Sequence, residues 1–197
     1  MKSKKRIILI IVLILSVLYV ARIFVINKNA VCAETLEYKK GEIVDFGNDY
    51  IDSIDDSKPG YAVQVLGYRI VDTKTFYEEF NLSNGEDVDT SYIPYYCLVK
   101  VKFYNKDSTL GENGGISLYQ MALVGDDYLS QISENVFCTM YPDMPGMNFS
   151  LQKGTSMEFE LPYPLDVVTG KDKDDLNKKS PYIEISEFPN RKLIKIK

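Results

Sequence analysis

The chain has 197 residues, with 28 acidic and 23 basic side chains and a formal net charge of −5 at pH 7. It contains no histidine, no tryptophan and only three cysteines. The lack of histidine excludes Ser-His-Asp and Cys-His catalysis and histidine-bound zinc, and three cysteines are too few for a four-cysteine metal site. We therefore expect no catalytic residue, no cofactor and no metal, and carboxylates remain as the candidate groups for acid–base chemistry.

A basic head and a long apolar stretch open the chain. Residues 1–6 carry four basic side chains, and residues 7–26 are almost entirely apolar. At about 1.5 Å per residue, a helix over this stretch reaches roughly 30 Å, the thickness of the hydrocarbon core of a bilayer. Because basic residues favour the cytoplasmic side, we predict a signal-anchor that crosses the cell membrane once and leaves the following domain extracytoplasmic.

Two other interpretations of this segment stay open. Val31-Cys32-Ala33 reads as a signal-peptide cleavage site, in which case the domain is secreted. Cys32 is also a candidate for lipidation, although the residue before it is not small. Four more apolar residues follow Arg22, and they favour the uncleaved anchor because they lengthen the apolar span. Arg22 lies near the outer end, from which it can reach the interface.

The part of the chain after Ala33 is strongly acidic. It holds 17 basic and 28 acidic residues, a net charge of −11. This charge argues against binding to nucleic acid and against docking onto anionic lipid head groups. The length suits one domain with a buried core. We assign residues 27–37 to a polar stalk and residues 38–197 to this domain.

Short apolar runs, separated by turn-forming residues, follow one another along the domain. The expected strands are residues 41–46, 61–71, 95–104, 116–124, 133–140, 155–161, 182–188 and 192–196. Gly67 interrupts the alternation of the second strand and predicts a bulge there. Pro162 and Pro164 are expected to end the pairing of the strand at 155–161.

The segments between these strands are expected to be loops, with one exception. Residues 73–80 suit one or two helical turns, whereas residues 48–60 and 171–179 are rich in turn formers or charge. A Pro189-Asn190 turn should return the last segment, 192–196, to the sheet. Many short strands with almost no helical periodicity indicate an all-β fold, and their spacing favours a β-sandwich.

The cysteines leave two interpretations open. Cys32 lies close to the membrane segment, so the candidate disulfide joins Cys97 and Cys138. An extracytoplasmic location permits such a bridge. Cys97, however, lies on an alternating strand, where a small buried thiol is an ordinary core residue.

Two acidic clusters and a glycine-rich run are expected to be solvated loops rather than binding sites. The segments in question are Asp49, Asp52, Asp55 and Asp56, then Asp172, Asp174 and Asp175, and residues 111–115. Neither acidic cluster has the ligand spacing of a calcium loop. The glycine-rich run precedes a strand and lacks the lysine and hydroxyl that contact phosphate.

One loop has the composition of a protein contact. Tyr141, Met144 and Met147 lie in a segment with two prolines and a glycine. Tyrosine and methionine offer large contact area with adaptable edges, so these residues are our candidate partner-binding loop. Tyrosine also suits strands, which remains the alternative.

The order of these segments resembles a known family. The resemblance is carried by residues 61–65 (YAVQV), 98–105 (LVKVKFYN), 154–162 (GTSMEFELP) and 189–192 (PNRK). They are similar to the telokin-like, immunoglobulin-like extracytoplasmic domains of unknown function common in Gram-positive bacteria, which are similar in fold to a mycobacterial secreted immunoprotective antigen. The resemblance implies an immunoglobulin-like antiparallel β-sandwich over residues 38–197, preceded by one N-terminal transmembrane helix. It supplies no catalytic residues, and the acidic stretch 72–92 departs from the family.

These observations together favour a membrane-tethered, extracytoplasmic, non-catalytic binding module whose partner is a protein or a cell-envelope component. One alternative is a cell-envelope hydrolase that uses paired carboxylates. Another is a solute-sensing domain, for which we expect a sizeable apolar cavity between the sheets.

Overall fold

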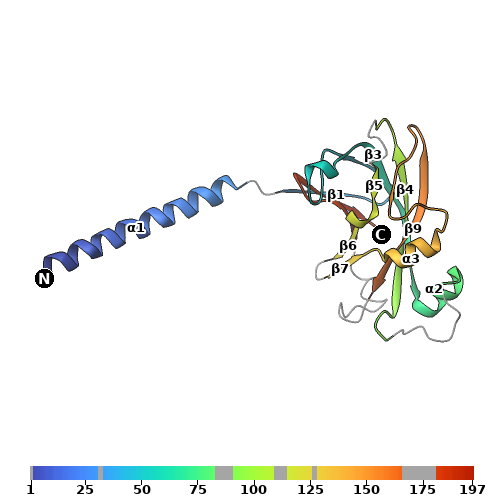
Figure 1. Ribbon diagram of the computed structural model, residues 1–197, viewed down its shortest axis with the longest axis horizontal. Coiled ribbons are helices and arrows are strands. Elements are labelled where there is room, and N and C mark those ends of the chain that lie inside the picture. The colour runs from blue at the N-terminus through green and yellow to red at the C-terminus, as the bar shows by residue number, and fades with distance from the viewer. Residues whose placement is uncertain (1, 31–32, 83–90, 109–114, 126–127, 166–180) are drawn as a thin grey trace. The chain divides into compact units, whose positions relative to one another are not determined.

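The computed structural model describes residues 2–30, 33–82, 91–108, 115–125, 128–165 and 181–197 (Figure 1). Contacts divide the chain into two units, residues 1–32 and residues 33–197. The first is a single helix and the second is a mostly β domain.

Helix α1 spans Lys2–Asn29 and contains no glycine or proline. Its segment Lys5–Lys28 has a mean hydropathy of 2.9, with none of this segment buried. The segment Lys5–Lys28 is apolar on all sides, and the Ser16 hydroxyl within it donates to the Val12 carbonyl at 2.9 Å. It is therefore long and apolar enough to cross a membrane, as a membrane anchor or as a signal sequence.

The larger sheet has the strand order β1-β11-β10-β6-β7. Its strands are β1 (Glu34–Tyr38), β11 (Asn190–Lys195), β10 (Tyr182–Ser186), β6 (Ala122–Gly125) and β7 (Tyr128–Gln131). β1 pairs with β11 in parallel, and the other neighbours are antiparallel. The prediction of an integral C-terminal strand is confirmed. Of the residues assigned to a stalk, 27–29 belong to α1 and 34–37 to β1.

The smaller sheet has the order β2-β3-β4-β9 and is antiparallel throughout. Its strands are β2 (Ile43–Gly47), β3 (Lys58–Asp72), β4 (Tyr95–Asn105) and β9 (Ser156–Leu165). The predicted bulge is present, since the register of β3 against β4 shifts between Val65 and Gly67.

Strand β9 runs through Pro162 and Pro164, so the prediction that these prolines end the pairing is wrong. β9 pairs only with β4, and an edge strand tolerates a missing N–H on its outer side. The main-chain carbonyls of both prolines accept hydrogen bonds. The Ser133 N–H donates to the Pro162 carbonyl at 3.3 Å, and the Ser130 hydroxyl donates to the Pro164 carbonyl at 2.7 Å.

Two helices cover parts of the sheets. α2 (Thr73–Phe80) confirms the predicted helical turns; the Asp72 side chain caps its start by accepting from the Thr75 N–H at 2.9 Å. α3 (Glu134–Met140) replaces the strand predicted over residues 133–140. The strand prediction was wrong because the apolar residues of this segment follow helical spacing. Phe137 is buried, and Val136 and Met140 on the same side of the helix are partly buried.

Short elements replace parts of two other predictions. The strand predicted over residues 116–124 is divided by the 3-10 helix η3 (Leu118–Gln120), which separates β5 (Ile116–Ser117) from β6. β5 pairs with β8 (Asn148–Phe149) in a two-stranded ladder. The loop predicted over residues 48–60 contains the 3-10 helix η1 (Ile54–Asp56) and the start of β3.

Side chains from both large sheets meet in one core. Buried members come from β3, β4 and β9 of the smaller sheet and from β6, β10 and β11 of the larger one, for example Val63, Val99, Leu161, Leu123, Ile183 and Ile194. A second cluster of Phe76, Tyr96 and Leu98 lies where α2 covers the outer side of β4. This cluster explains why Leu98, which points away from the core between the two sheets, is buried.

Candidate functional site

The three side chains of the predicted partner-binding loop contribute to the core, and partner binding by this loop stays a prediction. Met147 is only 2% exposed, and Tyr141 and Met144 pack against the core. The Tyr141 ring lies 5.2 Å from that of Phe159, and its hydroxyl accepts the Glu160 N–H at 2.8 Å. Tyr141 thus satisfies an outward N–H of edge strand β9, and this fixes the loop against the sheet.

The candidate disulfide partners, Cys97 and Cys138, are both free thiols in the structure. Cys97 is fully buried on β4, and this burial raises the pKa of its thiol to about 12. Cys138 is partly exposed on α3. Cys32 lies outside the described residues.

The acidic loops are only partly as expected. Asp49 is 8% exposed, and its carboxylate lies 2.6 Å from the Lys192 ammonium and 3.1 Å from the Asn190 amide nitrogen, so it is not solvated. Within the described ranges no three side chains of the ligating types group to hold a metal ion. Residues 111–114 and the cluster of Asp172, Asp174 and Asp175 lie outside those ranges.

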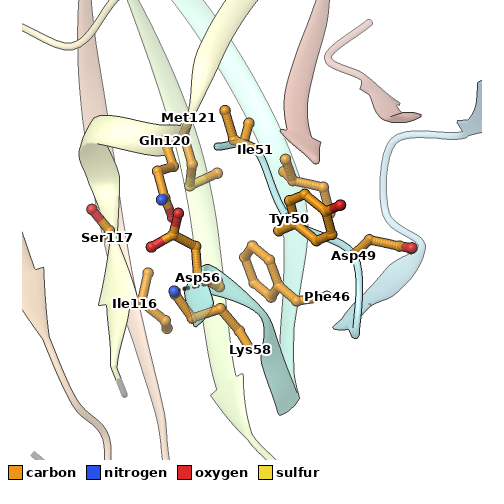
Figure 2. A pocket seen from close by; sticks show the side chains of 11 residues that line it. Phe46, Asp49, Tyr50, Ile51, Asp56, Lys58, Ile116, Ser117, Gln120 and Met121 are labelled. Atoms are coloured by element: carbon orange, nitrogen blue, oxygen red, sulfur yellow. Dashed lines mark hydrogen bonds between the residues drawn. The ribbon is translucent and has the colours of Figure 1, made fainter. Parts of the chain in front are cut away.

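The feature that sequence reasoning missed is a pocket beside Lys58, at the start of β3. It lies between the β2–β3 connection and the segment that carries β5 and η3 (Figure 2). Its lining is Phe46, Asp49, Tyr50, Ile51, Asp56, Lys58, Ile116, Ser117, Gln120, Met121 and Ile185. The space open to water inside amounts to about 10 Å³, which is room for one water molecule.

An open cleft adjoins this pocket and shares part of its lining. Asp56, Lys58, Ile116 and Ser117 border both, and Gly115, Asn148 and Phe149 complete the cleft. Its space open to water is about 380 Å³. We call the pocket and the cleft together the Lys58 cleft.

The local fold explains why Lys58 points inward. The Ser53 side chain accepts the Asp55 N–H, and the Asp56 carboxylate accepts the Ser53 N–H at 3.1 Å, so η1 has a stable start. Gly60 then adopts a left-handed backbone with φ of 85° and breaks the alternation of β3. A Cβ at Gly60 would lie 2.4 Å from the Ser108 nitrogen, so only glycine fits there.

The Lys58 ammonium is buried with few partners. The residue is 8% exposed, and Nζ donates to the main-chain carbonyl of Asp56. Burial lowers the pKa of Lys58, and the negative charge of Asp56 opposes part of this effect. Among the residues that the structure describes, Lys58 forms no ion pair.

This arrangement has a definite chemical capacity. An ammonium has three N–H donors, and the carbonyl of Asp56 takes one of them. The other two are available to an oxygen atom that enters the cleft, and charge-assisted hydrogen bonds are the strong ones. No sequence signal pointed here, because Lys58-Pro59-Gly60 reads as an exposed turn.

Comparison with known proteins gives a family and no activity. A family model described as "Domain of unknown function (DUF5028)" matches residues 35–192, from the second residue of β1 into β11. No curated protein and no solved structure matches the chain. The match includes Lys58 and every other residue of the Lys58 cleft. The chain therefore belongs to the DUF5028 family, whose function is unknown.

Proposed function

We propose that this chain is a single-pass membrane protein whose β domain lies outside the cytoplasm and acts as a non-catalytic binding module. The observation that carries the proposal is α1, an unburied apolar helix that four residues separate from the first residue of β1. Basic residues precede the apolar span and acidic residues are confined to the sequence after it, a distribution that favours a cytoplasmic N-terminus.

We further infer that the two large sheets form an immunoglobulin-like sandwich. Both sheets contribute to one core, and the strands are short and mostly antiparallel. The parallel pair of β1 and β11 is compatible with such a sandwich at an edge. Experimental coordinates in which the inner faces of the two sheets do not meet would rule this inference out.

A hydrolase with paired carboxylates receives less support. Asp49 and Asp56 do border one pocket, but Figure 2 shows the Asp49 carboxylate directed away from Asp56. It is already bonded to Lys192 and Asn190, and the pocket has room for one water molecule. A glycosidase needs both carboxylates free to meet a sugar between them.

A solute sensor with a cavity between the sheets is also less well supported. The pocket that reaches the core at Ile185 and Met121 is too small for a solute. Binding in the open part of the Lys58 cleft suits the available space better.

The topology can be tested with a C-terminal epitope tag on the full chain. Protease added to intact protoplasts should remove the tag, while permeabilised cells serve as the control for total protein. A tag that survives in intact protoplasts would place the domain in the cytoplasm. N-terminal sequencing of the mature protein separates an uncleaved anchor from a cleaved signal.

The binding role can be tested separately with the purified full chain in detergent micelles. Incubation with isolated cell-envelope material should retain the protein and leave the masses of the glycans and peptides unchanged. Release of smaller glycan or peptide products would show turnover and contradict the proposal.

A further inference from the structure

Lys58 is a buried ammonium that forms no ion pair within the described part of the chain. Buried charges in proteins are normally paired, because an isolated charge loses its hydration without compensation. The negative charge of Asp56 offsets part of the burial effect on the pKa of Lys58, but its carboxylate forms no ion pair with Lys58 and accepts the Ser53 N–H at 3.1 Å. The described residues thus leave Lys58 without an ion-pair partner, and an anion that enters the cleft can supply one.

The geometry leaves a way in for such a group. Figure 2 shows the Lys58 amine directed toward Asp56 at the centre of the pocket, and Lys58 borders the open cleft as well. The polar side chains of Ser117 and Asn148 line the same cleft. Its space of about 380 Å³ is within the range of sites that hold small ligands.

The surrounding charge restricts the class of anion. Asp56 contributes one negative charge beside the amine, and the chain after Ala33 carries a net charge of −11. The negative charge around the cleft repels a dianion such as phosphate about twice as strongly as it repels a carboxylate. Lys58 supplies only one positive charge to offset this repulsion. A monoanion can neutralise Lys58 with less repulsion.

We propose that the Lys58 cleft binds the carboxylate group of a small molecule or of a peptide terminus, with Lys58 as its counter-ion. The carboxylate accepts the two remaining N–H groups of Lys58, and Ser117 and Asn148 offer hydrogen bonds to the neighbouring amide or hydroxyl of the ligand. This inference names a ligand chemistry for the binding module proposed above and rests on that role.

The test uses the full chain in detergent micelles, labelled with ¹³C at lysine Cε. The resonance of Lys58 is identified by its loss in Lys58→Met. Titration with N-acetylglycine should shift it saturably at millimolar concentration. N-acetylglycinamide, in which a neutral amide replaces the carboxylate, should not shift this resonance. Sodium chloride at equal ionic strength should not shift it either. The exposed Lys153 provides an internal control.

Thermal melting supplies a second readout. N-acetylglycine should raise the melting temperature of the wild type relative to N-acetylglycinamide, and the Lys58→Met protein should melt as a folded domain without this increase. Equal responses to the two compounds, or a ligand-induced increase that persists in Lys58→Met, would overturn the proposal. Phosphate binding that exceeds N-acetylglycine binding would overturn the assignment to carboxylates. These measurements do not depend on membrane topology. A negative result for carboxylate binding is therefore distinguishable from a negative result in the protease test of the membrane anchor.

Discussion

Two buried lysines, Lys192 and Lys58, show how the same residue type can serve different ends. Lys192 donates to the carbonyls of Asp45 and Phe46 at 2.7 and 2.8 Å and lies 2.6 Å from the Asp49 carboxylate. Its three N–H groups thus have three acceptors. Lys58 has one acceptor within the described residues, and the open cleft lies beside it. The number of acceptors, rather than burial, separates a structural lysine from one left available to a ligand.

The contacts of Lys192 also join the two large sheets. Lys192 lies on β11 of the larger sheet, and its two carbonyl acceptors lie on β2 of the smaller one. β2 is an edge strand whose register against β3 shifts between Asp45 and Gly47, and the ammonium donates to the two carbonyls at this irregularity. The comparison therefore predicts large effects on stability at Lys192 and small ones at Lys58.

The largest expected effect is that of Lys192→Met. It leaves the Asp49 carboxylate buried without its cation, and breaking a buried pair in this way costs about 3–5 kcal/mol. Urea denaturation of the full chain in micelles should show this decrease in the free energy of unfolding. The double variant with Asp49→Asn should recover part of it. A loss below about 1 kcal/mol would contradict the structural role of Lys192.

Next in size is Gly60→Ala. The added methyl group meets the Ser108 backbone, and the left-handed conformation at φ of 85° is unfavourable for alanine. We expect a loss of about 2 kcal/mol, together with a weaker response to N-acetylglycine because the turn that directs Lys58 inward is disturbed. Gly154→Ala is the matched control, since Gly154 has a φ of 77° but no atom near its Cβ position. Equal losses in the two variants would show that contact with Ser108 is unimportant.

The effect of Lys58→Met should be smaller and of opposite sign. Removing a poorly partnered buried charge removes its desolvation cost, so the free energy of unfolding should rise by about 1 kcal/mol. Since the pKa of Lys58 is lowered on folding, the wild type should gain stability as pH rises through this lowered pKa toward the unfolded value. The difference in the free energy of unfolding between Lys58→Met and the wild type should therefore become smaller from neutral to alkaline pH. A clear loss of stability at neutral pH would instead make Lys58 a structural lysine.

The smallest effect is expected at an exposed lysine. Lys100 lies 3.1 Å from the Glu158 carboxylate, and both side chains are largely exposed. Exposed pairs contribute roughly 0–1 kcal/mol, so Lys100→Met should change the free energy of unfolding by less than about 1 kcal/mol. A larger loss would mean that ion pairing on this face matters as much as burial does.

Much of the fold could be predicted because it is encoded locally. The alternation in β3 and β4, the bulge at Gly67 and the turns of α2 are all visible in short windows of sequence. β1 was missed because its five residues are mostly exposed and gain their structure only from β11, far along the chain. No local pattern reports such a partner.

The site was less predictable than the fold for the same reason. Lys58 looked like part of an exposed turn, and its burial depends on η1, on β5 and on Ile185 of β10. Met147 was expected to be an exposed loop residue, but its side chain is buried in the core. In both cases the environment of the side chain is set by segments distant in sequence, whereas composition reported only the residue type.

The parallel pairing of β1 with β11 has a consequence for biogenesis. β11 lies between β1 and β10, so the first strand of the domain cannot find its neighbour until the last strand has been synthesised. Such pairing gives a high contact order, which slows folding because a long loop must close before any contact forms. During synthesis β1 must wait, with its backbone unpaired toward β11, until Asn190–Lys195 leaves the ribosome and takes its place beside it.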